Sequence, residues 1–191
     1  QEIENIEGVV AVSEIVEDRI FVRYNDKNHI AYLKGVDENF YKITPSDSLL
    51  FLGEWLKPNL GEVVIGFGIS AKLSVGARDY TNLIELYAPK PGKGQINMID
   101  PSSAFATEKV VASGIYQINE ELNAKYVFSD LETARNLLSV DSTSVSYLEF
   151  KLAPNTQEAT VVSELETIIP DTIVAKNRMQ QNDALYKMLN S

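Results

Sequence analysis

The 191-residue sequence has no cysteine and only one histidine, His29. The absence of cysteine excludes disulfides, thiolate metal sites and cysteine nucleophiles. A single histidine excludes a multi-histidine metal site and leaves little room for a histidine-based catalytic triad. His29 lies on a predicted hairpin strand without an obvious partner, where a histidine is more often a surface residue than a general base.

Long apolar runs and an excess of basic residues are also lacking. No stretch reaches the ~18 to 20 apolar residues that cross a bilayer. The net charge of −10 argues against nucleic-acid binding, which needs clustered Lys and Arg, and against tight contact with an anionic membrane surface. The hydrophobic content of 45% is ordinary for a folded soluble protein, and the length suits one domain or two small ones.

Sequence motifs of the common hydrolases and nucleotidases are absent. The chain has no Gly-x-Ser-x-Gly elbow, His-Glu-x-x-His pair or P-loop. Carboxylates are plentiful, for example Glu120 and Glu121, but no spacing singles out an acid and base pair, and a solvated acidic face is the better interpretation. We therefore expect no catalytic residue, no bound metal and no cofactor.

The first third of the chain predicts β-structure. The segment Gly8–Val16 is apolar, Ile20–Tyr24 alternates between apolar and polar residues, and the polar cluster Asn25–Asn28 then turns the chain into a second strand. The following segment, 37–56, is irregular with short helical turns. We expect its large aromatic residues, Phe51 and Trp55, to pack inward.

The C-terminal third alternates strands with helices. Ser129 and Glu132 have capping-box spacing before one helix, and Asn155 and Glu158 have it before another. Each of these two helices has an apolar stripe: Leu131, Ala134, Leu137 and Leu138 in the first, and Val162, Leu165 and Ile169 in the second. A strand at "TIVAK" and a last amphipathic helix in "NRMQQNDALYKMLNS" follow. This order predicts a small α/β layer after a mostly β middle.

The segment Glu62–Leu73, "EVVIGFGISAKL", contains a Gly-x-Gly-x-x-Ala pattern that begins at Gly66, and Glu85 follows 19 positions later. A dinucleotide site needs this turn to start a full helix and a crossover of roughly a dozen or more residues. Gly76 and "ARDYTN" limit the helix to about two turns. We therefore expect Gly66 and Gly68 to let a short helix pack tightly on its strand; the alternative is a nucleotide-dependent enzyme.

The segment Ala88–Ala106 is rich in proline and glycine and shows no periodicity. Loops beyond ~12 to 15 residues inside a domain are usually functional or disordered. This loop carries four apolar residues between its turn formers, Ile96, Met98, Ile99 and Phe105. They indicate equally a docking element for another protein and a plain connection that folds back onto the core.

Four segments, in order, resemble one family: "GVVAVSEIVEDRIFV" with "AYLKGVDENF", then "EVVIGFGISAKLSVGARDYTNLIELYAP", and last "EKVVASGIYQINEELNAKYVFSDLETARNLLS". They are similar to the periplasmic domain between the first and second membrane helices of FtsX-like ABC transporter permeases. Within that superfamily the lipoprotein-releasing permeases (LolC/LolE type) are closer and the macrolide exporter MacB is more distant. One departure is Ala77 and Arg78, which separate a glycine and aspartate that are adjacent in the family.

The resemblance implies an α+β fold with two subdomains and no enzymatic activity. A βαβ-rich, membrane-proximal subdomain would comprise residues 1–19 and 107–191, and a mostly β subdomain, 20–106, would be inserted with a projecting loop, 88–106. The resemblance, and a start without Met or a signal peptide, imply a piece of a longer inner-membrane protein whose periplasmic domain this is.

In the lipoprotein-releasing family a loop at this position recruits a soluble carrier. The resemblance therefore implies a partner-binding set of Pro91, Ile96, Met98, Ile99, Pro101 and Phe105. The implied partners are the ATP-binding subunit, reached through the membrane part, a periplasmic carrier or lipoprotein, and a second permease in a dimer. The alternatives are an FtsX-type domain that recruits a cell-wall hydrolase and a MacB-type efflux domain that transmits movement.

Overall fold

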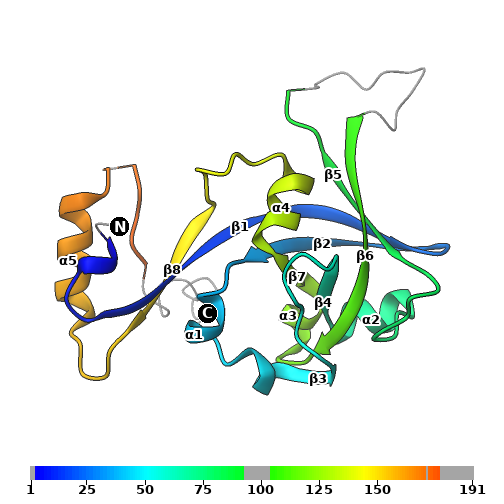
Figure 1. Ribbon diagram of the computed structural model, residues 1–191, viewed down its shortest axis with the longest axis horizontal. Coiled ribbons are helices and arrows are strands. Elements are labelled where there is room, and N and C mark those ends of the chain that lie inside the picture. Colours follow the sequence, from blue (N-terminus) through cyan, green and yellow to red (C-terminus); the bar gives the residue numbers. More distant parts are fainter. Residues whose placement is uncertain (1–2, 93–103, 171, 177–191) are drawn as a thin grey trace, which may run out of the picture. The chain divides into compact units, whose positions relative to one another are not determined.

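The computed structural model describes residues 3–92, 104–170 and 172–176. These ranges contain both strands and helices, which confirms the predicted α+β class (Figure 1). The strands are β1 Val9–Tyr24, β2 Lys27–Val36, β3 Leu50–Gly53, β4 Glu62–Gly66, β5 Ile84–Pro89, β6 Phe105–Tyr116, β7 Tyr126–Asp130 and β8 Tyr147–Leu152. The helices are α1 Phe40–Ile43, α2 Phe67–Leu73, α3 Glu120–Lys125, α4 Leu131–Leu138 and α5 Glu158–Ile168, with 3₁₀ turns at Ile3–Asn5 and Ser46–Leu49.

The chain divides into two compact units. Of the described residues, 3–12, 150–170 and 172–176 belong to the first unit, and 13–92 and 104–149 belong to the second. Strands β1 and β8 each contain residues of both units, so the backbone passes between the units inside two β-strands. The two-subdomain division inferred from the family resemblance has other boundaries and remains a prediction.

In the second unit the strand pairings close on themselves. The neighbours run β1–β2–β7–β4–β6–β5 and back to β1, and β3 adds to β6 outside this ring. The β2–β7 and β4–β6 pairs are parallel, and the other pairs of the ring are antiparallel. A closed ring removes most exposed strand edges, which in open sheets invite pairing with other chains.

The main core lies on the inner face of this ring. Alternate residues of β1 point inward because side chains alternate across a strand, and Ile20 and Val22 are almost fully buried. Helix α4 adds Ala134, Leu137 and Leu138, three residues of the predicted stripe. A Cβ on Gly35 would lie 2.2 Å from the Cβ of Ala134, so this glycine is needed for α4 to lie close to β2.

A second, aromatic cluster packs where α1 and the following loop cover β4 and β7. Trp55 is buried as predicted, 5.3 Å from the Phe128 ring and stacked on Phe40 at 6.3 Å. Phe51, in contrast, is 58% exposed, so its predicted inward packing is wrong. It lies on β3, a strand at the outside of the ring, and its ring contacts exposed Phe67 at 5.2 Å.

The first unit has a small core of its own. Ile6, Val161 and Leu165 are buried together, so α5 buries Val161 in place of the predicted Val162. Gly8 has a φ of +90°, and the Ala153 N–H donates to its carbonyl at 2.8 Å. Residues 172–176, which are the "TIVAK" segment, form no strand, and the predicted final helix lies outside the described residues.

Two predicted helix caps differ from the observed ones by one or two residues. Asp130, and not Ser129, caps α4 by accepting from the Thr133 N–H at 2.8 Å. Helix α5 begins after Gln157, which makes no side-chain cap bond, and Asn155 lies in the turn before it with a φ of +68°. In the part of the chain that the structure describes, no helix is long and apolar enough to span a membrane.

Candidate functional site

The predicted docking loop starts from a β-hairpin. Strands β5 and β6 pair up to Pro89 opposite Phe105, and the Lys90 N–H donates to the Ala104 carbonyl at 2.8 Å, so Ala88 and Ala106 are strand residues (Figure 1). The ends of the predicted loop are thus strand, because both edges of the segment continue the β5–β6 register.

The structure places two of the six predicted partner-binding residues. Pro91 is exposed just after β5, and Phe105, at the start of β6, is 37% exposed. They lie on neighbouring strand ends, because Phe105 is opposite Pro89. The other four predicted residues lie outside the described ranges: Ile96, Met98, Ile99 and Pro101.

A hydrogen-bonded carboxylate stabilises the base of this hairpin. Glu85 on β5 accepts from the Tyr87 hydroxyl and from the Arg23 Nε, both at 2.7 Å. These bonds, the one from Tyr87 first, lower the pKa of Glu85. Lys109 on β6 lies 3.6 Å away. Three strands are therefore joined by the Glu85 side chain.

The glycine pattern at Gly66 serves helix packing, although not the contact that we predicted. Helix α2 has seven residues, in line with the predicted two turns, and ends at Ser74 in the left-handed conformation, before Gly76. A Cβ on Gly66 would lie 2.0 Å from the Asn123 carbonyl oxygen, and one on Gly68 would lie 3.1 Å from it. The glycines thus make room for α3, a neighbour that the sequence pattern did not indicate.

The residues that depart from the family pattern form a turn held by two side chains. Arg78 has a φ of +62°, and its guanidinium pairs with Glu54 at 2.5 Å. The next residue, Asp79, accepts from the Tyr24 hydroxyl at the end of β1 at 2.5 Å. This bond is the main reason that the pKa of Asp79 falls to about 2. The departure changes a surface turn and leaves the ring of strands intact.

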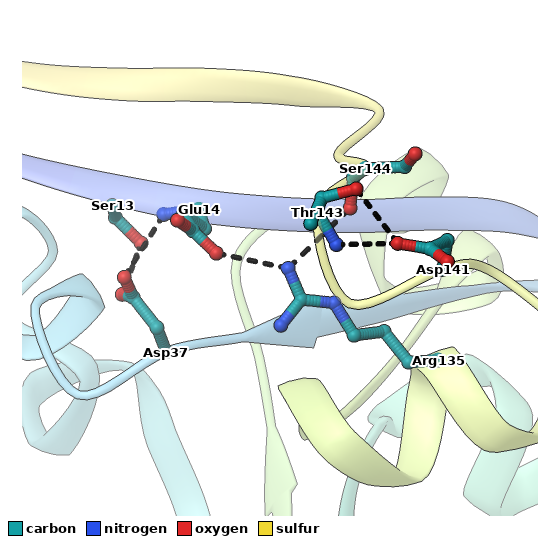
Figure 2. A network of polar contacts seen from close by, with 7 residues as sticks. All are labelled: Ser13, Glu14, Asp37, Arg135, Asp141, Thr143 and Ser144. Carbon is teal, nitrogen blue, oxygen red and sulfur yellow. Dashed lines mark hydrogen bonds and ion pairs between the residues drawn. The ribbon is translucent and has the colours of Figure 1, made fainter.

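A network of polar contacts lies where β1 enters the second unit. Asp37, directly after β2, accepts from the Ser13 hydroxyl at 2.7 Å and from the Glu14 N–H at 3.0 Å (Figure 2). The same carboxylate accepts from the N–H groups of Asn39 and Phe40 at 3.0 and 3.1 Å. One side chain therefore ties the first residues of β1 in this unit to the turn that begins α1.

Arg135 binds the second of these β1 residues, Glu14, through its side chain. Its Nη2 lies 2.9 Å from the Glu14 carboxylate and 3.4 Å from the Ser144 carbonyl (Figure 2). The loop of Ser144 is ordered by Asp141, which accepts from the Thr143 N–H at 2.8 Å and from its hydroxyl at 2.7 Å, and these bonds lower the pKa of Asp141. Helix α4, β1 and the loop before β8 meet at this guanidinium.

The start of β8 is attached to β1 next to this point. The Ser146 N–H donates to the Ile15 carbonyl at 2.8 Å, and the Ser146 hydroxyl accepts from the Glu17 N–H at 2.8 Å. The Tyr147 hydroxyl donates to the Glu17 carboxylate, and burial raises the pKa of Tyr147. We call the contacts of Asp37, Arg135 and Ser146 with β1 the strand anchor.

The strand anchor holds both connections between the units at their entry into the second unit. Several hydrogen bonds act on β1 at this point, and those of Ser146 join the start of β8 to β1. Sequence reasoning missed it: Asp37 was visible only as part of the "GVD" segment, and Arg135 and Glu14 have no pattern that links them. Among the described residues, no three acidic or histidine side chains gather as a metal site.

Two solved structures are similar to this fold. The extracellular domain of the noncanonic ABC-type transporter YknZ from Gram-positive bacteria covers 87% of this chain and 80% of its own, with a TM-score of 0.59 and 12% identity. The periplasmic region of MacB from Actinobacillus actinomycetemcomitans covers 87% and 71%, with a TM-score of 0.54 and 12% identity. No protein-family model and no curated protein sequence matches the chain. The likeness confirms the predicted MacB-like fold.

Proposed function

We propose that this chain is the extracytoplasmic domain of an ABC transporter permease in a bacterial inner membrane. The observation that carries the proposal is the fold, which matches the MacB periplasmic region and the YknZ extracellular domain over most of each chain. ATP is hydrolysed on a separate subunit or domain, and this domain acts by binding and movement without bond chemistry. In the membrane a second permease accompanies it.

The strand anchor suits a domain that passes on movement. A displacement of the first unit reaches the second unit through β1 and β8, since both strands contain residues of both units. Asp37 and Arg135 hold β1 to the ring. An extended strand can lengthen very little. A pulling force on β1 or β8 therefore acts on the strand anchor before it acts on the core.

The finer proposal is release or transfer of a substrate such as a lipoprotein to a docked periplasmic carrier. The support is the position of the segment 88–106, which continues from a stabilised hairpin, and the exposure of Pro91 and Phe105 at its base. The division into a membrane-proximal part, 1–19 with 107–191, and an insert, 20–106, is part of the same proposal.

Replacement of residues 95–103 tests the docking step. Replacing Gln95–Ser103 with a Gly-Ser linker of equal length should leave the circular dichroism spectrum unchanged and abolish carrier binding. A matched control replaces the exposed turn residues 58–60 in the same way. Carrier binding that survives the first replacement contradicts the docking proposal, whereas capture of a cell-wall amidase in place of a carrier supports the FtsX-type alternative.

The parent sequence tests the wider proposal. Apolar helices of ~20 residues should flank this piece on both sides, and their absence contradicts the permease assignment. Titration with NAD or ATP tests the enzyme alternative, because a bound nucleotide raises the melting temperature in proportion to the logarithm of its concentration. No shift at millimolar nucleotide is the expected result.

A further inference from the structure

The outward face of four neighbouring strands carries aromatic and aliphatic side chains, of which three are exposed while Tyr87 and Tyr126 are partly buried. Phe21 on β1, Ile30 on β2 and Tyr32 on β2 are 38%, 52% and 36% exposed. The register places Phe21 opposite both Ile30 and Tyr87 of β5, and Tyr32 opposite Tyr126 of β7. Directly opposite residues share one face of a sheet. We call these five residues the aromatic face.

Edge contacts within the aromatic face hold its rings in place. The Phe21 and Tyr87 rings meet at 6.0 Å in an edge-to-face arrangement, and the Tyr32 and Tyr126 rings do so at 6.2 Å. Such pairs lower the freedom of each ring. Binding of a partner here therefore costs less side-chain entropy of this surface than binding to exposed side chains that make no such contacts.

Cationic side chains border this face. Arg19 is opposite Tyr32 in the β1–β2 register. The Arg23 guanidinium lies 5.3 Å from the centre of the Tyr87 ring, and the Lys125 ammonium lies 5.1 Å from that of Tyr32. Arg19 has an exposed side chain, and it makes no ion pair within ranges 3–92, 104–170 and 172–176.

The acidic residues next to this face already accept hydrogen bonds. Glu85 accepts from Arg23 and Tyr87, and Lys109 also lies near it. Glu17 accepts from the Tyr147 hydroxyl, and Asp18 accepts from the Arg19 N–H at 2.6 Å. In a chain whose net charge is −10, four cations therefore lie around this face against these three carboxylates, namely Arg19, Arg23, Lys109 and Lys125, and Arg19 makes no ion pair with a described residue.

We propose that the aromatic face is a docking surface for a second protein that sets acidic side chains around an apolar patch. Tyrosine, phenylalanine and arginine are the residues enriched at the centres of protein interfaces. The acid-rich remainder of the chain repels such a partner, so charge selects this face over the others. The inference rests on the proposed function for the existence of a protein partner, and it adds the partner's charge and its place.

A photo-crosslinking amino acid in the full-length protein in cells tests this surface. One variant carries it at Ile30, and the control carries it at Leu52 on β3, which is equally exposed at 53%. We expect a crosslinked protein at Ile30 that is not captured at Leu52. Arg19→Glu should lower that yield about tenfold, the effect of ~1.4 kcal/mol. Reversing one acidic residue on the captured protein should restore the yield with Arg19→Glu.

Each other outcome decides against the proposal. No product at Ile30, the same products at Ile30 and Leu52, or a yield that Arg19→Glu leaves unchanged contradicts an acidic protein partner. A product with lipid indicates a membrane surface, and a product with a second copy of the chain indicates self-association. Arg19→Ala, which removes the charge without reversing it, should give a smaller loss, and an unchanged unfolding midpoint in both variants excludes misfolding.

Failure of this inference and failure of the proposed function are distinguishable. A parent sequence without flanking apolar helices contradicts the transporter proposal whatever Ile30 captures. A parent with those helices and no charge-dependent product at Ile30 contradicts the docking surface alone.

Discussion

Arg135 of α4 and Glu14 of β1 are 121 residues apart in the sequence, and their side chains form an ion pair of 2.9 Å. The Arg135 side chain is mostly buried, and the carboxylate is about half exposed. The pair joins a helix of the core to the strand that leaves this unit, so its strength bears on how firmly β1 is held.

A double-mutant cycle measures this strength. With Arg135→Met and Glu14→Gln, singly and together, we expect a coupling of about 0.5 to 1 kcal/mol in the free energy of unfolding, because one partner is shielded from solvent. Urea unfolding supplies the four values. The control pair is Lys57 and Glu54, which are 3.6 Å apart and both exposed, and its coupling should be close to zero. Equal coupling in both cycles contradicts a structural role for Arg135.

Asp37 is expected to contribute more than the ion pair. Asp37→Ala removes the acceptor of four hydrogen bonds, from Ser13, Glu14, Asn39 and Phe40, and should cost about 2 to 3 kcal/mol in the free energy of unfolding. Asp37→Asn keeps one acceptor oxygen and should cost less.

The control for Asp37 is Asp26→Ala in the exposed turn between β1 and β2, which should change stability by no more than about 0.5 kcal/mol. Urea unfolding compares the three variants. A loss for Asp37→Ala no larger than that of Asp26→Ala means that the anchor does not hold β1.

Gly66 and Gly76 provide a matched pair for the glycine pattern. The backbone of Gly66 has a φ of −69°, which any residue adopts, so only space requires a glycine there. Gly66→Ala should cost about 1 to 3 kcal/mol, because its Cβ would lie 2.0 Å from the Asn123 carbonyl oxygen. Gly76 has nothing within 4 Å of a new Cβ, so Gly76→Ala should leave the melting temperature unchanged or raise it. A neutral Gly66→Ala contradicts the packing role.

The bond from Tyr24 to Asp79 predicts a pH dependence. The pKa of Asp79 is lowered from 3.8 to about 2 in the folded protein. The bond therefore stabilises the fold above the unfolded pKa, and this contribution is lost as the pH falls from 3.8 to about 2. Melting temperatures of the protein and of Tyr24→Phe should differ at neutral pH and converge towards pH 2. A difference that is constant across this range excludes Asp79 as its source.

Local sequence patterns predicted the elements that depend on interactions between residues close in the sequence. The β1–β2 hairpin follows from alternation and the polar turn at Asn25, which adopts a φ of +53°. The apolar stripe of α4 is correct for the same reason. Trp55 and Phe51 show the limit, because both are large and apolar, yet only Trp55 is covered by a neighbouring element. Whether an aromatic residue is buried depends on which strand lies at the outside, and pairing decides this.

The candidate site was predictable only in part. The position of the hairpin followed from its flanking strands, but the strands extend into the segment because cross-strand pairing continues past the last periodic residue. The cap of α4 moved from Ser129 to Asp130 because a carboxylate one position later reaches the Thr133 N–H. The strand anchor joins residues whose proximity depends on the closed ring, and no local pattern carries that information.

The long separation within the strand anchor also sets an order of events during biosynthesis. The first residues of β1 are made early, but Arg135 and Ser146, to which they bind, follow more than a hundred positions later. At typical synthesis rates this interval is roughly 10 s. Until then β1 can pair with β2 and β5, which are made earlier, but its first residues lack the contacts of Arg135 and Ser146, so this end of the strand is fixed last.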